Sequence, residues 1–165
     1  MNTIAVIIAS YFIAIPLSVV LYELFTMNKN ERLKLAALLV VGGIISLILA
    51  KVGSMLISDP RPFIAGHFDP LIVSSTDNGF PSDHTLLAAF IGFVMLSRSR
   101  RTGILLLVVA LAIGLARMYA GVHHSWDVLG SFVITGISYL LVRKALHYAH
   151  NHRLQNHNAD DTTSK

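Results

Sequence analysis

Five long apolar segments occupy most of this 165-residue chain. They cover roughly residues 4–26, 35–57, 84–97, 103–121 and 126–146. Because about 20 apolar residues in a helix cross the hydrocarbon core of a bilayer, four of these segments are long enough to span a membrane. The third is shorter, and we expect its amino end to lie low, near the lipid headgroups. The sequence therefore predicts an all-α fold, a polytopic membrane helix bundle with about five transmembrane helices.

The composition agrees with a membrane location. Hydrophobic residues make up 54% of the chain and charged residues only 13%, with a mean hydropathy of +0.64. A soluble domain of this length would rarely tolerate that balance. The chain has no cysteine, which excludes disulfides, thiolate nucleophiles and cysteine metal sites. We expect residues 1–146 to form one integral membrane domain and residues 147–165 to form a polar cytoplasmic tail.

The basic residues between the apolar segments predict the orientation of the chain. Most of them follow the first, third and fifth segments: Lys29, Arg32, Lys34, Arg98, Arg100, Arg101, Arg143 and Lys144. Because cytoplasmic loops carry an excess of lysine and arginine, we expect the amino terminus outside and the carboxyl terminus inside. The loops 58–83 and 117–126 then share the outer face. The net charge of +4 mostly reflects this pattern and the tail, so we expect no nucleic-acid partner.

The first polar cluster is DPRPF at residues 59–63. Arg61 stands between two prolines, whose fixed φ angles stiffen the backbone that carries the guanidinium. A single loop arginine also commonly anchors to lipid headgroups, and that alternative stays open. Lys51 lies inside the second apolar segment, where a charge is costly unless it is paired or extends to the interface. We expect Lys51 either to reach toward Arg61 and a bound phosphate or to extend to the outer interface.

The second cluster is FPSDHT at residues 80–85, which has the pattern of a helix start with Ser82 as the N-cap. Unpaired amides and the positive end of the helix dipole attract anions there, so the sequence predicts a phosphate site. His84 would lie in the first turn, close enough to protonate a leaving oxygen. Alternatively, Ser82 and Asp83 only cap a transmembrane helix, and His84 lies in the membrane interface.

The third cluster is ARMYAGVHHSWD at residues 116–127. His123 and Asp127 are four residues apart and would share one helix face, so the carboxylate can hold one ring nitrogen while the other faces a substrate. An imidazole held in this way is a nucleophile whose attack on phosphorus would give a phosphohistidine. Arg117 supplies a planar guanidinium that suits phosphate geometry. His124, three residues before Asp127, is a second candidate for the nucleophile.

The order of DPRP, PSDH and RMYAGVHHSWD resembles the three-part signature of the type-2 phosphatidic acid phosphatase superfamily. That signature consists of a lysine with an Arg-Pro, a Pro-Ser-X-His, and an arginine followed by X5-His-X3-Asp. The resemblance covers residues 51–131, about half of the chain. The family's lysine stands seven residues before the arginine, where this chain has Ser54, whereas Lys51 is ten residues before it. Asp83 also replaces a glycine that many members carry.

The resemblance implies roles for the matching residues. His123 would be the nucleophile, Asp127 its orienting partner and His84 the general acid. The groups that would bind phosphate are Arg61, Arg117, Ser82, the amide of Asp83 and Lys51. Within the superfamily, the small size of the chain and the sequence VHHSWDVLGS most resemble the bacterial undecaprenyl pyrophosphate phosphatases. This implies a cell-membrane enzyme that converts a lipid diphosphate to the monophosphate and inorganic phosphate at the outer face, with no cofactor or metal.

Other interpretations remain open at this stage. A phosphatidic acid or phosphatidylglycerophosphate phosphatase would use the same residues, whereas the related vanadate-dependent haloperoxidases are soluble. A metal-binding or transport protein would use external histidines and carboxylates: His67, Asp69, His84, His123 and His124. A structural membrane protein without activity would leave the cost of ionisable groups at helix ends unexplained. The sequence gives no oligomeric state.

Overall fold

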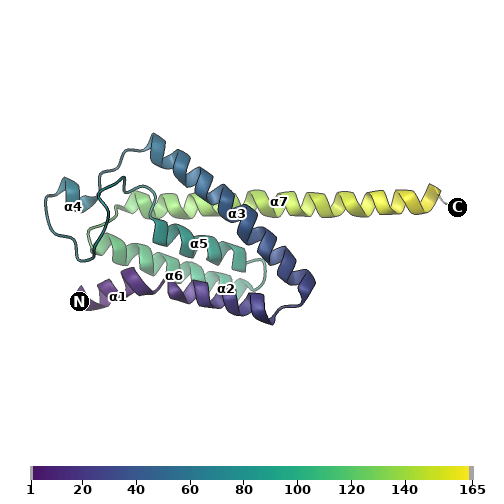
Figure 1. The fold of residues 1–165 in the computed structure, drawn as a ribbon, viewed down its shortest axis with the longest axis horizontal. Helices are drawn as coiled ribbons and strands as arrows, with labels where there is room; N and C mark the ends of the chain where they lie inside the picture. The colour runs from purple at the N-terminus through teal and green to yellow at the C-terminus, as the bar shows by residue number, and fades with distance from the viewer. Residues whose placement is uncertain (1, 164–165) are drawn as a thin grey trace.

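The computed structural model describes residues 2–163 (Figure 1). Within this range the chain forms seven helices joined by loops, and no strand. Side chains are described up to residue 149. The helices are α1 (Asn2–Tyr11), α2 (Ala14–Thr26), α3 (Lys29–Leu56), α4 (Pro62–Ala65), α5 (Asp83–Met95), α6 (Arg100–Tyr119) and α7 (Ser125–Thr163). The predicted all-α fold is therefore confirmed.

The helices reproduce the five predicted apolar segments. Four stretches are long and apolar enough to cross a membrane: Asn2–Thr26, Lys29–Leu56, Arg100–Tyr119 and Ser125–Ala149. The remaining apolar helix, α5, matches the short third segment and has only 13 residues, which corresponds to about 20 Å of helix rise. The chain is a multi-pass membrane protein, and α7 continues through the predicted tail to Thr163. The tail side chains from residue 150 onward lie outside the described residues.

The first span is not one continuous helix, because α1 ends at Tyr11 and α2 begins at Ala14. Pro16 explains the interruption, since proline has no N–H to donate to the carbonyl of Phe12. That carbonyl accepts from the amide of Ile15 instead, at 3.0 Å. The break leaves the last carbonyls of α1 without partners inside the helix.

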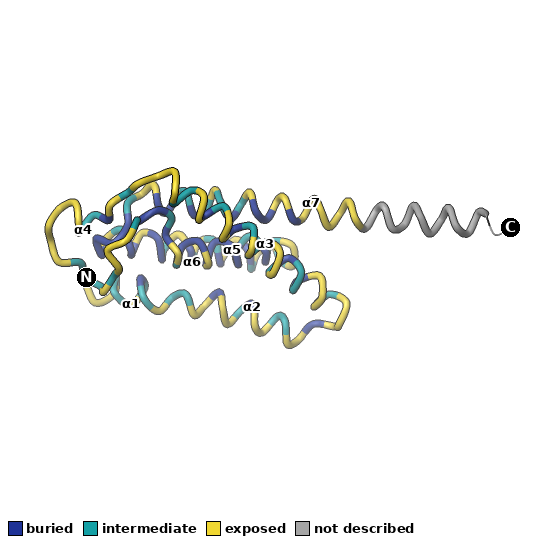
Figure 2. The backbone as a smooth tube through the Cα atoms, turned by 45° about the horizontal axis from the view of Figure 1, so that its top comes forward, coloured by how far each residue is buried: buried dark blue, intermediate teal, exposed yellow. Residues whose placement is uncertain are grey.

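Helix α5 lies in the middle of the bundle and packs against α2, α3, α6 and α7 (Figure 2). Most of its residues are buried, including Ala88, Ala89 and Phe90. Close packing around it depends on glycine. A Cβ at Gly114 of α6 would lie 2.6 Å from a methyl carbon of Val128 and 3.2 Å from Oγ1 of Thr85. Helix α5, which corresponds to the short third apolar segment, is thus the core around which the longer helices are arranged.

The polar clusters lie at one end of the bundle and the basic loops at the other (Figure 1). The 57–82 connection and the 120–124 connection meet at the first end, where the amide of Leu71 donates to the carbonyl of Ala120 at 3.0 Å. The sequence predicted that these loops share one face. The side of the membrane on which they lie remains a prediction.

Candidate active site

A tight turn after α6 places His123 inside the bundle. Gly121 has a φ of +79°, in the left-handed region that favours glycine, and a Cβ there would lie 2.6 Å from the ring of Phe68. The amide of Val122 donates back to the carbonyl of Arg117 at 3.2 Å. The turn brings the His123 side chain back toward the bundle, where it is only 3% exposed.

The surroundings of His123 determine which of its ring nitrogens carries the proton. Nδ1 lies 3.0 Å from the carbonyl oxygen of Gly79 and 3.1 Å from Oδ2 of Asp127. Both of these partners are acceptors, so Nδ1 must be the protonated, donating nitrogen. In the neutral imidazole, Nε2 then carries the lone pair. The ring is oriented as a nucleophile through Nε2.

Two guanidinium groups face that lone pair. Nη1 of Arg61 lies 3.4 Å and Nη2 of Arg117 lies 3.5 Å from Nε2 of His123. Arginines are suited to bind the oxygens of a tetrahedral anion, because their donors form a planar fork. A phosphate held by both would have its phosphorus next to the nucleophilic nitrogen. The arrangement is one that could bind an anion beside the unprotonated nitrogen of His123.

Arg61 is held in place by its own loop. Its Nη2 lies 2.8 Å from Oδ1 of Asp77 and donates to Oγ of Ser75 at 3.2 Å, while Nη1 donates to the carbonyl of Val122 at 3.2 Å. Hydrogen bonds from Ser75 and Arg61 lower the pKa of Asp77. Because Arg61 is 6% exposed, it does not anchor to lipid headgroups. The sequence did not identify Asp77 and Ser75 as partners of Arg61, because no local pattern marks a contact between residues so far apart in a loop.

Arg117 is held by the first span. Its Nη1 donates at 3.3 Å to the carbonyl of Ala9, which lies in the last turn of α1. The break between α1 and α2 leaves this carbonyl available. Nε of Arg117 is buried and has no hydrogen-bond partner among the described residues. The sequence could not reveal this contact, since a backbone carbonyl has no residue signature.

The start of α5 contributes the second cluster. Ser82 is the N-cap, as predicted, but its side chain caps no amide; its hydroxyl accepts from Oγ1 of Thr85 at 3.1 Å. It is fully buried, and its backbone N–H donates to the carbonyl of Asp127 at 3.3 Å. Asp83 is exposed in the first turn, and half-buried His84 lies within electrostatic range of Arg117 and His123. All three predicted clusters thus meet around His123.

A second group of polar side chains lies on the Asp127 side of His123. His124 Nδ1 lies 3.1 Å from Oδ1 of Asp59, so this imidazole faces Asp59 while His123 faces the two arginines. This geometry favours His123 over His124 as the nucleophile. Burial and the neighbouring Asp127 raise the pKa of Asp59. Ligand atoms of Asp59, His124 and Asp127 lie within 4.8 Å of one another, and among the described residues this is the group close enough to hold a metal ion.

The predicted contact of Lys51 with Arg61 does not form. Lys51 is exposed on α3, and no hydrogen bond or ion pair joins it to the cluster within the described part of the chain. Ser54, at the position of the family's lysine, instead accepts from Nδ2 of Asn78 at 3.2 Å. This contact helps to hold the 57–82 loop, because the same Asn78 accepts from the amide of Asp59 at 2.9 Å.

The fold and the cluster define a class: a multi-pass helical membrane protein in which two arginines and an aspartate surround a buried histidine. Comparison with known families agrees. The PAP2 superfamily matches residues 31–151, and the chain belongs to this superfamily. The match begins in α3, so α1 and α2, including the Ala9 carbonyl that holds Arg117, lie outside it.

Two relatives from Bacillus match most of the chain. The bacitracin transport permease protein BcrC of Bacillus licheniformis is 37% identical over 133 residues, which is 80% of this chain and 64% of that protein. The undecaprenyl-diphosphatase BcrC of Bacillus subtilis (strain 168) is 32% identical over 134 residues, covering 81% of this chain and 69% of that protein. The chain thus spans less than two thirds of the first of these relatives.

Two solved structures share the fold. Aquifex aeolicus LpxE superposes with a TM-score of 0.69 at 25% identity, covering 87% of each chain. A PAP2-type phosphatidylglycerolphosphate phosphatase from Bacillus subtilis gives 0.64 at 26% identity, covering 89% of this chain and 77% of that one. Both structural similarities cover most of the helix bundle and are not confined to the segments around His123.

Proposed function

We propose that this protein is a lipid phosphatase that hydrolyses undecaprenyl diphosphate to the monophosphate and inorganic phosphate through a phosphohistidine on His123. The position of His123 Nε2, between the guanidinium groups of Arg61 and Arg117, carries this proposal. The hydrogen bond of Nδ1 to Asp127 supports it, because it leaves the attacking nitrogen unprotonated.

In the first step, Nε2 of His123 attacks the terminal phosphorus, and the bond from phosphorus to the bridging oxygen breaks. The leaving group is the lipid monophosphate, whose departing oxygen takes a proton from His84. Asp127 stabilises the cationic ring that forms. General acid catalysis of this kind contributes about 10²–10⁴-fold to the rate.

In the second step, water attacks the phosphohistidine and the nitrogen–phosphorus bond breaks. His84, now neutral, takes a proton from that water, and inorganic phosphate leaves while His123 returns to its starting state. Arg61 and Arg117 stabilise the charge on the transferring oxygens in both steps, and their burial reduces the screening of that charge by water. Ser82 would donate its hydroxyl proton to the bound phosphate, a role that its acceptance of a hydrogen bond from Thr85 leaves open to it.

The choice of substrate rests on the relatives. A curated relative at 32% identity is named undecaprenyl-diphosphatase, which favours a polyprenyl diphosphate. Phosphatidylglycerophosphate is the second candidate, because a solved phosphatase named for it shares the fold at 26% identity. Phosphatidic acid is a third, since it presents the same terminal phosphate. We expect this chemistry on the outer face of a bacterial cell membrane, because the basic loops lie at the other end of the bundle.

The decisive experiment measures phosphate release by the purified protein from these three lipids. We expect the highest kcat/KM with undecaprenyl diphosphate. A higher value for phosphatidylglycerophosphate would change the substrate but keep the mechanism. Release from none of the three lipids, by protein that is folded and monodisperse, would contradict the proposal.

A further inference from the structure

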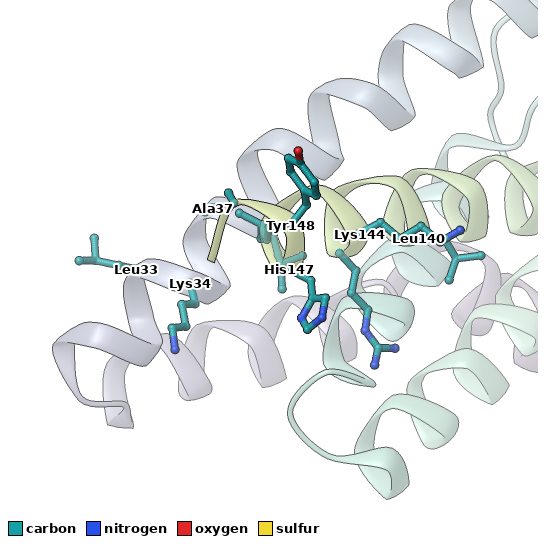
Figure 3. Close-up of a pocket in the computed structure, with 11 residues that line it drawn as sticks. Leu33, Lys34, Ala37, Leu140, Lys144, His147 and Tyr148 are labelled. Carbon is teal, nitrogen blue, oxygen red and sulfur yellow. The ribbon is translucent and has the colours of Figure 1, made fainter. Parts of the chain in front are cut away.

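The end of the bundle opposite the catalytic cluster contains a groove between α3 and α7, with a volume of about 1140 Å³ (Figure 3). Its polar lining includes Lys34, Arg143 and Lys144, and its apolar lining includes Ala37, Leu38 and Leu140. None of the described residues that line it is acidic. The groove therefore combines positive charge with an apolar wall.

Among the described residues, the cations of this groove have no acidic partner, in contrast to Arg98 at the same end of the bundle. Arg98 pairs with Glu23 at 3.6 Å and with Glu31 at 3.3 Å. Within the described residues, no such ion pair involves Lys34, Arg143 or Lys144. Among the side chains up to residue 149, no acidic group therefore neutralises the positive charge in the groove.

Arg143 is also held in position. Its guanidinium carbon lies 6.0 Å from the centre of the Tyr139 ring, and Nη1 donates to the Tyr139 hydroxyl at 3.5 Å. Tyr139 itself is buried and stacks on Phe93. A cation packed against a fixed aromatic ring loses less freedom on binding an anion than a flexible surface side chain does. This arrangement distinguishes Arg143 from an ordinary cation at a helix end.

The depth of the groove matches a membrane interface. About 27 Å of helix rise separates Arg143 from Ser125, where α7 begins beside the active site. The hydrocarbon core of a bilayer is about 30 Å thick, so the cations lie close to the headgroups of the opposite leaflet. Basic pockets between transmembrane helices at this depth are suited to anionic lipid headgroups.

We propose that this groove binds one anionic phospholipid of the leaflet opposite the active site. Its phosphate lies among Lys34, Arg143 and Lys144, and an acyl chain covers Leu38 and Leu140. The proposal is independent of the catalytic chemistry, because the groove and His123 lie at opposite ends of the bundle.

Native mass spectrometry tests the proposal on protein equilibrated in detergent with phosphatidylglycerol and phosphatidylcholine. We expect the protein to retain phosphatidylglycerol in preference to phosphatidylcholine. Arg143→Gln/Lys144→Gln should reduce that retention about 25-fold, since each cation near an anionic lipid contributes roughly fivefold. Arg100→Gln/Arg101→Gln is the matched control, because it removes two exposed charges from the same end, outside the groove.

A second variant guards against misfolding of the charge-deleted protein. Ala37→Trp keeps every charge and places a bulky ring against the apolar wall of the groove, so it should also weaken the retention of phosphatidylglycerol. Equal losses in the groove variant and in the matched control would show general electrostatic attraction and overturn the proposal. Full retention by Ala37→Trp, or no preference for phosphatidylglycerol in the unaltered protein, would overturn it as well.

Discussion

Nδ1 of His123 lies 3.1 Å from Oδ2 of Asp127, and the same oxygen accepts from the backbone amide of His124 at 2.8 Å. Asp127 is the third residue of α7, so its carboxylate reaches back to an amide at the start of its own helix, as acidic residues do in capping boxes. The orientation of the imidazole is therefore fixed by the local geometry of a helix start. No substrate is needed to set it.

Replacing His123 by alanine should abolish phosphate release and the labelling of the protein by a radioactive terminal phosphate, because the nucleophile is lost. His124→Ala is the matched control, since it removes the adjacent imidazole that faces Asp59. We expect that variant to retain labelling. Labelling that persists in His123→Ala and disappears in His124→Ala would assign the nucleophile to His124.

Replacing Asp127 by asparagine should lower kcat on the order of 10³-fold or more while KM changes little. The amide cannot stabilise the imidazolium, and it permits the wrong tautomer of His123. Steady-state kinetics with circular dichroism as a folding control measures this effect. A rise in KM with kcat unchanged would mean that Asp127 serves substrate binding instead.

Two aspartates in the 57–82 loop should have opposite effects on the stability of the folded state at neutral pH. Because burial and Asp127 raise the pKa of Asp59, its ionised form destabilises the folded state at pH 7. Because Ser75 and Arg61 lower the pKa of Asp77, its ionised form stabilises the folded state.

Thermal unfolding tests this pair directly. Asp59→Asn should raise the Tm at pH 7, and Asp77→Asn should lower it. As the pH falls, the Tm difference between Asp59→Asn and the unaltered protein should shrink while the pH is still above the usual aspartate pKa of about 3.9, because Asp59 protonates there. The Tm difference for Asp77→Asn should shrink only below that pH. Shifts of the same sign at pH 7 would contradict the interpretation.

Vanadate should inhibit phosphate release competitively, because it mimics phosphate at the site between Arg61 and Arg117. Treatment with EDTA should leave activity unchanged, since these two guanidiniums supply the positive charge that a metal ion would otherwise provide. Enzyme assays with and without each reagent check both expectations. Activity lost to EDTA and restored by a divalent cation would implicate the Asp59, His124 and Asp127 group in catalysis.

A tag at the carboxyl terminus should be protected from protease added to intact cells, because the basic loops predict a cytoplasmic carboxyl end. A tag at the amino terminus should be cleaved under the same conditions. Immunoblotting before and after permeabilisation measures both. The reverse pattern would place the active site on the inner face.

Much of the fold follows directly from the sequence. The apolar segments predicted five membrane helices because their length must match the bilayer. The short third segment predicted a membrane helix unlike the others, and α5, with 13 residues, is indeed too short to be counted among the four spans. The sequence did not indicate that α5 would be the buried centre of the bundle, since apolar residues face lipid and protein alike.

The site divides in the same way between local and distant contacts. The sequence predicted the pairing of His123 with Asp127 from their four-residue spacing, although His123 precedes α7 and does not share a helix face with Asp127. The pair forms because the Asp127 carboxylate reaches back over the start of its helix. The contacts of Arg117 with Ala9, of His123 with Gly79 and of Arg61 with Asp77 join residues from different elements or distant parts of a loop. Lys51 makes none of these contacts, although it stands near Arg61 in the sequence. Only the packing of the helices and the path of the 57–82 loop decided these features, because backbone carbonyls and contacts between distant residues leave no periodic pattern in a sequence.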